Sequence, residues 1–287
     1  MLCYATHAEG KPSVSFFYDM HCERRPLASL SVIVITKNEA HNIEACLQSV
    51  SFAQQIVVLD SGSSDDTVTL SQTAGAEVSA RLDWKGFGVQ KNRALALATG
   101  DWVLSIDADE RLTPDLQIEI QRVIENPACQ IYDFPRLSSY CGQYMRHSGW
   151  YPDRVTRLFK RGAATFSDEL VHERLVTSKA VGQLDAALLH ESFRSLESVL
   201  DKVNRYSSAG ARQLFEKGKT ASPGKALAHG LWAFFRTYVL RRGFLDGRMG
   251  LLLAISNAEG TYYRYLKLWL MSRPKVTVAT APAESAK

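Results

Sequence analysis

Two carboxylates, Asp107 and Asp109, follow an apolar run, Val103–Ile106, that is typical of a buried strand. Residues two apart on a strand project to the same face, and ligands of open α/β sheets bind beyond the carboxyl ends of the strands. Carboxylate oxygens suit Mg²⁺ or Mn²⁺, and a divalent cation there could stabilise a diphosphate as it leaves. The pair therefore predicts a metal site, although an Asp-x-Asp pair is also common in solvated surface turns.

Two earlier strand-like runs also end in polar residues. The β-branched run 30–36 ends at Thr36, and the apolar run 55–60 ends at Asp60 before the turn formed by residues 61–66. A helical pattern follows each run, one through residues 43–50 and the other from near Thr67. Because strands, short loops and helices alternate, we predict a doubly wound α/β sheet with these polar residues along one edge.

Four motifs resemble the family 2 glycosyltransferases, which have the GT-A fold, use nucleotide sugars and invert the anomeric centre. They are SVIVITKNE at 31–39, VVLDSGSSDDT at 57–67, KNRALALATGD at 91–101 and DADE at 107–110. Later motifs at 157–160, 171–175, 189–192 and 238–250 are similar to the bacterial lipopolysaccharide inner-core β-1,4-glucosyltransferase subfamily. The resemblance spans roughly residues 30–272. It implies a mixed, doubly wound GT-A sheet with a helical C-terminal module.

The resemblance assigns a UDP-sugar and a divalent metal to the sheet edge. It places the nucleotide against Thr36, Glu39, Asp60, Lys91, Asp107 and His172, and the metal against Asp107 and Asp109. Lys91 stands where the family more often has arginine. The residue types leave alternatives open, since Asp60 could cap its own turn, Glu39 could be a first-turn helix carboxylate and Lys91 a solvated helix cation. Glu110 could assist the metal or simply be solvated.

An inverting transfer needs a carboxylate that accepts the proton of the acceptor hydroxyl. The segment 166–175 offers Asp168, Glu169 and Glu173. The similarity to the glucosyltransferase subfamily favours Glu173, with His172 orienting the diphosphate or the ion. The His-Glu pairs at 172–173 and 190–191 could instead indicate zinc, but neither forms an H-E-x-x-H motif. The aromatic stretch 150–154 suits the acceptor sugar or a cluster at the core edge.

The length of 287 residues and hydrophobic content of 46% fit one large domain, or one domain with an appendage. We expect a poorly ordered leader at 1–29, a glycosyltransferase domain at 30–193, a helical basic module at 194–273 and a disordered tail at 274–287. The 5 cysteines show no paired spacing, which favours reduced thiols in the cytosol. Residues 1–29 contain no continuous apolar stretch typical of a signal peptide.

The charge is unevenly distributed. Residues 1–193 contain 18 basic and 24 acidic residues, whereas residues 194–287 contain 16 basic and 6 acidic residues. The basic part interleaves cations with aromatic residues at 226–242 and 262–271, a pattern typical of interfacial helices, and no run there is long and apolar enough to span a bilayer. We predict contact with an anionic membrane surface rather than nucleic acid. The alternatives are a solvated basic face and ordinary core helices.

These features predict an inverting transferase that moves a sugar, with glucose expected, from a UDP-sugar to the lipopolysaccharide inner core. It would act as a peripheral protein on the cytoplasmic face of the bacterial inner membrane. Alternatives are another lipid-linked or cell-surface polysaccharide acceptor, a nucleotidyltransferase, or a binding module with an inactive sheet domain. No glycine-rich phosphate loop follows the first strand, which weighs against the nucleotidyltransferase.

Overall fold

The computed structural model describes residues 28–168 and 174–273. The leader up to residue 27, the tail from residue 274 and the segment containing Glu169, His172 and Glu173 lie outside the described residues. The first half of the chain forms four parallel strands in the order β3-β2-β1-β4. Their bounds are β1 Leu30–Thr36, β2 Gln55–Asp60, β3 Glu77–Ala80 and β4 Trp102–Asp107.

The second half extends this sheet with strands of mixed direction. β8 (Asp153–Lys160) pairs antiparallel with β4 and with β6 (Ile131–Tyr140), and β12 (Leu188–Phe193) runs parallel to β6. The short strands β5 (Glu110–Leu112), β7 (Gln143–Tyr144) and β11 (Val181–Gln183) complete the sheet. A separate ribbon pairs β9 (Thr165–Phe166) with β10 (Leu175–Val176). The predicted mixed, doubly wound fold is confirmed.

Helices cover both faces of the parallel half because its strands are apolar on both sides. The helices α1 (Ile43–Gln48) and α4 (Pro114–Glu125) share one core with Val32, Val34 and Leu104. On the opposite face, α3 (Phe87–Leu95) and β9 pack with Ile33, Val57 and Val103. α2 (Thr67–Thr73) begins at the predicted residue.

The strand register brings the polar strand ends together. Thr36 lies opposite Asp60 in the β1–β2 pair, and Ile35 lies opposite Asp107 in the β1–β4 pair. The three motifs therefore meet at one edge of the sheet, as the alternation of strands and helices predicts.

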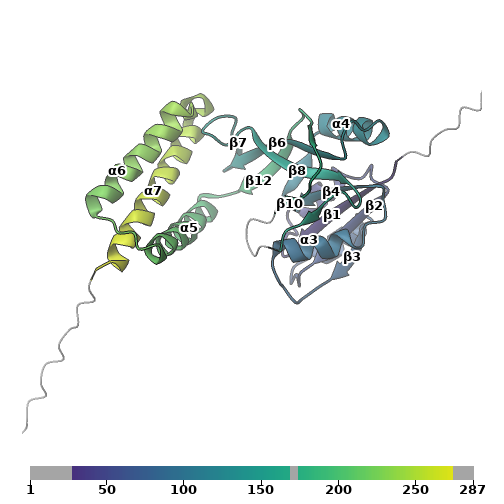
Figure 1. The fold of residues 1–287 in the computed structure, drawn as a ribbon, viewed down its shortest axis with the longest axis horizontal. Helices are drawn as coiled ribbons and strands as arrows, with labels where there is room; N and C mark the ends of the chain where they lie inside the picture. The colour runs from purple at the N-terminus through teal and green to yellow at the C-terminus, as the bar shows by residue number, and fades with distance from the viewer. Residues whose placement is uncertain (1–27, 169–173, 274–287) are drawn as a thin grey trace, which may run out of the picture.

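Three helices form a bundle beside the sheet (Figure 1). They are α5 (Leu196–Glu216), α6 (Pro223–Phe235) and α7 (Gly247–Met271). The π-helical turn η1 (Arg236–Leu240) and the 3-10 helix η2 (Gly243–Asp246) connect α6 to α7. Gly250 permits the tight return of the chain, since a Cβ atom there would lie 1.8 Å from the carbonyl oxygen of Gly243.

A buried carboxylate fastens the bundle to the sheet. Asp246 accepts hydrogen bonds from the backbone amides of Arg146 and His147 at 3.1 and 3.0 Å and from the Ser148 hydroxyl at 3.1 Å. The Nδ1 atom of His147 lies 3.0 Å from the same carboxylate. The motif at 238–250 therefore docks the helices onto the loop that follows β7.

Candidate functional site

A pocket of about 580 Å³ opens at the carboxyl ends of β1 and β4. Its lining includes Thr36, Glu39, Asp107 and Asp109, which are four of the residues predicted to bind nucleotide or metal. His190 from β12 closes another side. The structure thus gathers residues from three strands around one cavity at the predicted edge of the sheet.

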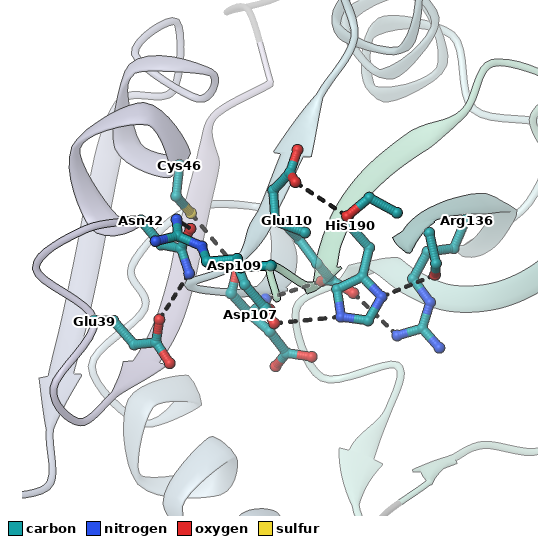
Figure 2. A network of polar contacts seen from close by, with 12 residues as sticks. Glu39, Asn42, Cys46, Asp107, Asp109, Glu110, Arg136 and His190 are labelled. Atoms are coloured by element: carbon teal, nitrogen blue, oxygen red, sulfur yellow. Dashed lines mark hydrogen bonds and ion pairs between the residues drawn. The ribbon is translucent and has the colours of Figure 1, made fainter. Parts of the chain in front are cut away.

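Asp109 and His190, which both line this pocket, point toward one another (Figure 2). The Nε2 atom of His190 lies 3.3 Å from Oδ2 of Asp109, and its Nδ1 atom lies 2.9 Å from the hydroxyl of Ser138. In one tautomer Nε2–H donates to Asp109. In the other, Nδ1–H donates to Ser138 and leaves the Nε2 lone pair available to a metal ion. Sequence reasoning gave His190 a role only in the zinc alternative, and the signal that could have found it was its place in the motif at 189–192.

Asp107 is engaged by cations through both carboxylate oxygens. Lys91 Nζ lies 3.0 Å from Oδ1, and Arg157 Nη2 lies 2.7 Å from Oδ2. Burial alone would raise the pKa of Asp107, but Arg157 and Lys91 hold it far below its usual range. The Lys91 side chain is 3% exposed, so the alternative of a solvated helix cation is wrong.

Glu110 extends this ion-pair chain into the protein. Its side chain is 0% exposed and accepts from Arg157 at 3.1 Å, from Arg136 at 3.3 Å and from the backbone amide of Asp107 at 2.9 Å. Arg136 continues to Asp153 at 2.6 Å. The alternative of a solvated Glu110 is therefore wrong, because this carboxylate is a buried structural partner of the site.

Asp60 folds back onto its own turn. Its Oδ2 atom accepts from the amides of Gly62 at 2.8 Å and Ser63 at 2.9 Å, and Oδ1 accepts from the Ser63 hydroxyl. It is buried and is not among the residues that line the pocket. Asp65 caps α2, where the Thr67 hydroxyl lowers the pKa of the carboxyl, whereas Asp66 makes no side-chain cap.

The first strand supplies a buried oxygen without a partner. Thr36 lines the pocket, and its Oγ1 atom makes no hydrogen bond within the described part of the chain. A buried hydroxyl without a hydrogen-bond partner is destabilising, and a bound ligand could supply that partner. Glu39, on the loop after β1, accepts from the Asn42 amide at 2.9 Å and also lines the pocket.

An exposed aromatic pair forms another wall of the pocket. Trp84 and Phe87 pack edge to face with their ring centroids 4.9 Å apart, and both remain about half exposed. Such a platform could stack on a base or a sugar ring. Sequence reasoning missed both residues, because Trp84 lies in the loop before α3 and Phe87 at the first position of that helix, and neither belongs to a motif.

Asp109 and His190 offer one carboxylate and one imidazole to a divalent ion at the pocket. Among residues 28–168 and 174–273, no group of three metal-binding side chains is assembled. Mg²⁺ commonly takes one or two protein ligands and completes its shell with substrate phosphates and water. Asp109 would supply the carboxylate and His190 a nitrogen, whereas Asp107 is already paired with two cations.

Of the three candidate bases, only Asp168 lies within the described residues. Asp168 is exposed and follows β9, where Asn92 of α3 donates to the carbonyl of Phe166 at 2.8 Å. The backbone amide of Ser167 donates to the carbonyl oxygen of Arg174 at 2.9 Å. Glu169, His172 and Glu173 lie outside the described residues, so their roles stay predictions.

Comparison with known proteins agrees with this arrangement. The model of the family described as "Glycosyl transferase family 2" matches residues 31–183. An uncharacterized glycosyltransferase of Rickettsia prowazekii is 31% identical over 268 residues, which cover 89% of this chain and 91% of that protein. The lipopolysaccharide core biosynthesis glycosyltransferase LpsC of Rhizobium meliloti is 29% identical over 273 residues, covering 88% of this chain and 97% of LpsC.

A solved structure, glucosyl-3-phosphoglycerate synthase from Mycobacterium tuberculosis, matches with 27% identity and a TM-score of 0.34 over 39% of this chain and 44% of its own. That similarity is confined to less than half of either protein. The family model, by contrast, spans more than half of this chain, and its match begins in β1 and ends in β11. The chain therefore belongs to glycosyl transferase family 2, and it is a glycosyltransferase.

Proposed function

We propose that this enzyme transfers a hexose, with glucose the first candidate, from a UDP-sugar to the inner core of lipopolysaccharide, with inversion at the anomeric carbon. The observation that carries the proposal is the pocket that holds Thr36, Asp109 and His190 together at the sheet edge. The 29% identity to LpsC, named for lipopolysaccharide core biosynthesis, favours that acceptor over other lipid-linked or surface polysaccharides. The nucleotidyltransferase alternative is set aside because the family transfers glycosyl groups.

Different residues of the pocket would bind different parts of the donor. Trp84 and Phe87 offer a stacking surface, and the free hydroxyl of Thr36 offers a hydrogen bond to the nucleoside. Glu39 remains a candidate for binding the ribose, and Asp60 for binding the uracil imide. To accept a hydrogen bond from the base, Asp60 must also keep or give up the hydrogen bonds that it accepts from Gly62 and Ser63. Asp109 and His190 would hold Mg²⁺ or Mn²⁺. When bound, that ion supplies positive charge to the departing diphosphate.

The ion-pair chain gives the site its rigidity. Lys91 and Arg157 hold Asp107 in place, and the turn from Asp107 to Glu110 carries Asp109 between two fixed points. Preorganised charges of this kind need little rearrangement during the reaction. We expect the base to be Glu173, with Asp168 and Glu169 as the other candidates and His172 near the diphosphate.

The helical module presents an apolar surface suited to a peripheral place on the cytoplasmic face of the inner membrane. Large side chains on α6, η1 and η2 are exposed, among them Leu227, Leu231, Trp232, Phe235, Leu240 and Phe244. Across the described residues, no helix has both the length and the apolar character needed to cross a bilayer. Apolar side chains beside cations suit shallow insertion into an anionic leaflet.

Release of UDP from a panel of UDP-sugars, with and without Mg²⁺ or Mn²⁺, tests the donor and the metal together. Asp109→Ala should abolish metal-dependent release while the protein stays folded, because a partly exposed carboxylate just beyond a strand adds little to core packing. Asp115→Ala, on an exposed turn of α4, is the matched control. Wild-type turnover of Asp109→Ala in the presence of a chelator would reject the metal site.

The base is tested separately. Glu173→Gln should lower kcat by roughly 10²–10⁴-fold with little change in donor binding, because the amide keeps the shape but cannot accept the proton. If Asp168→Asn or Glu169→Gln gives that phenotype while Glu173→Gln does not, the base is reassigned.

Membrane contact is tested by co-sedimentation with vesicles containing phosphatidylglycerol. Trp232→Ser with Phe235→Ser should weaken binding, and salt should weaken it in the wild type. Leu82→Ser replaces an exposed apolar residue of the sheet domain and serves as the control. Wild-type protein that stays unbound at low salt would reject membrane association.

A further inference from the structure

A second pocket, of about 540 Å³, lies where the sheet meets the helical bundle. Four cations line it, one from each of four segments. They are Lys202 of α5, Arg236 at the start of η1, Arg241 before η2 and Arg264 of α7. No carboxylate residue is among those that line this pocket.

Asp109 attracts Lys202 at a distance, but no direct ion pair neutralises these cations in the described part of the chain. Within residues 28–168 and 174–273, none of the four forms an ion pair with a carboxylate. Four cations around one cavity give it a positive charge, which an anionic ligand would neutralise. Arginine in particular binds phosphate and carboxylate through paired N–H donors.

Glycines keep the guanidinium groups in place. A Cβ atom at Gly149 would lie 2.5 Å from Cδ of Arg241, and one at Gly210 would lie 2.7 Å from Nε of Arg264. Larger residues at these positions would displace the arginine side chains. The positions of Arg241 and Arg264 in the pocket therefore depend on glycine at residues 149 and 210.

The floor of the pocket is aromatic. Trp150, Phe193 and Tyr140 pack with ring centroids between 5.9 and 6.1 Å apart, and all three line the cavity. Lys202 Nζ lies 4.4 Å from the centroid of Phe193. Cations above an aromatic floor suit a ligand with both a ring face and an acidic group.

One strand connects this pocket to the donor pocket. His190 lines the first cavity and Phe193 lines the second, and both belong to β12. Three residues of a strand cover about 10 Å. Burial lowers the pKa of Lys202 and Asp109 raises it, which places Lys202 within the electrostatic reach of the donor site. A chain of sugar units could therefore reach from one pocket to the other.

We infer that the second pocket binds an acidic group, phosphate or carboxylate, carried by the acceptor saccharide, and so orients the acceptor toward the donor. This inference rests on the proposed function, because it names the part of the acceptor that the enzyme recognises. Trp150, predicted either to meet the acceptor or to belong to an aromatic cluster, does both in this arrangement.

Calorimetric titration at low salt tests the inference with glucose 6-phosphate, glucuronate, glucose and inorganic phosphate as probes. We expect the two acidic sugars to bind more tightly than glucose and than inorganic phosphate. Arg241→Gln with Arg264→Gln should weaken that binding by about 10-fold or more, since hydrogen bonds to charged groups are lost. The control, Arg212→Gln with Arg248→Gln, removes two exposed cations of the bundle, on α5 and α7, that lie outside the pocket.

Gly210→Ala provides a variant that keeps every charge. Its methyl group should displace Arg264 and weaken binding of the acidic sugars several-fold while α5 stays helical. Equal binding of glucose and the acidic sugars, or no effect of the pocket variants, would overturn the inference. So would tighter binding of inorganic phosphate than of glucose 6-phosphate.

Vesicles of phosphatidylglycerol distinguish a lipid headgroup from a saccharide. If the double arginine variant loses vesicle binding and the wild type does not bind acidic sugars, the pocket serves the membrane and the inference is wrong. Slow UDP release from the donor without acceptor separates the two proposals. Normal release without binding of acidic sugars refutes only this inference, whereas absent release with every UDP-sugar refutes the proposed function.

Discussion

At the edge of the sheet the central charges alternate in sign, whereas within the described residues the cations between sheet and bundle form no ion pair with a carboxylate. Lys91, Asp107, Arg157, Glu110 and Arg136 alternate in sign and are mostly buried. The cations of the second pocket lie on three helical segments and one turn around a cavity. Alternating buried charges fix a local geometry, while a group of like charges is suited to recognising something from outside.

Glu110→Gln should produce the largest loss of stability. The change leaves Arg136 and Arg157 with a neutral partner in a buried setting, and breaking a buried ion pair costs about 3–5 kcal/mol. Urea denaturation followed by circular dichroism measures the effect. Glu125→Gln, at the exposed end of α4, should leave the midpoint unchanged. A loss for Glu110→Gln no larger than this control would mean that the chain of ion pairs is not structural.

Asp107→Asn should have a smaller effect with a distinctive pH dependence. Its side chain is 34% exposed, so we expect a loss of about 2 kcal/mol. Since the folded pKa lies far below the unfolded value, the contribution of Asp107 is fully present above about pH 4 and declines as the pH falls below it. Unfolding measured from pH 3 to pH 8 should show a difference from wild type that is constant above pH 5 and shrinks in acid. A difference that grows in acid contradicts the assignment.

The double variant Arg241→Gln with Arg264→Gln should change the free energy of unfolding in the opposite direction to Glu110→Gln. Relieving repulsion between two solvated cations raises stability by up to about 0.5 kcal/mol. Thermal unfolding at low and high salt measures this, because salt should remove the gain. A clear destabilisation would show that these arginines stabilise the fold. The second pocket would then not differ from the sheet edge in this respect.

Asp83→Asn should have the smallest effect. Asp83 and Arg93 form an exposed ion pair at 2.7 Å, and the Arg93 side chain lowers the pKa of that carboxyl. Solvent screens such pairs, so we expect no measurable change in the unfolding midpoint at pH 7. A change comparable with that of Asp107→Asn would show that burial is not what separates the two classes of ion pair.

The parallel half of the fold follows from local sequence. Runs such as 30–36 and 55–60 are apolar, end in polar residues and precede helical patterns, and each of these signals is contained in a short window. The position of Asp109 at a strand end follows in the same way. Family resemblance, rather than periodicity, supplied the roles expected for Thr36, Glu39 and Lys91.

What could not be predicted depends on contacts between distant segments. His190 meets Asp109 only because β12 inserts between β6 and β5, and no local pattern specifies that order. The burial of Glu110 depends on Arg136 and Arg157, which come from two later strands. The second pocket combines a loop, a strand end and three helices, so its cations look like ordinary surface charge in the sequence.

The buried carboxylate of Asp246 has a consequence for building hybrid enzymes from relatives of this protein. A chimera that exchanges only the helices after residue 194 would separate Asp246 from the amides of Arg146 and His147 that it serves. Where the new helices lack a carboxylate at this position, such a graft would leave these amides without their acceptor. We therefore expect an exchange of acceptor preference between relatives to succeed when residues 143–149 are exchanged together with the helices.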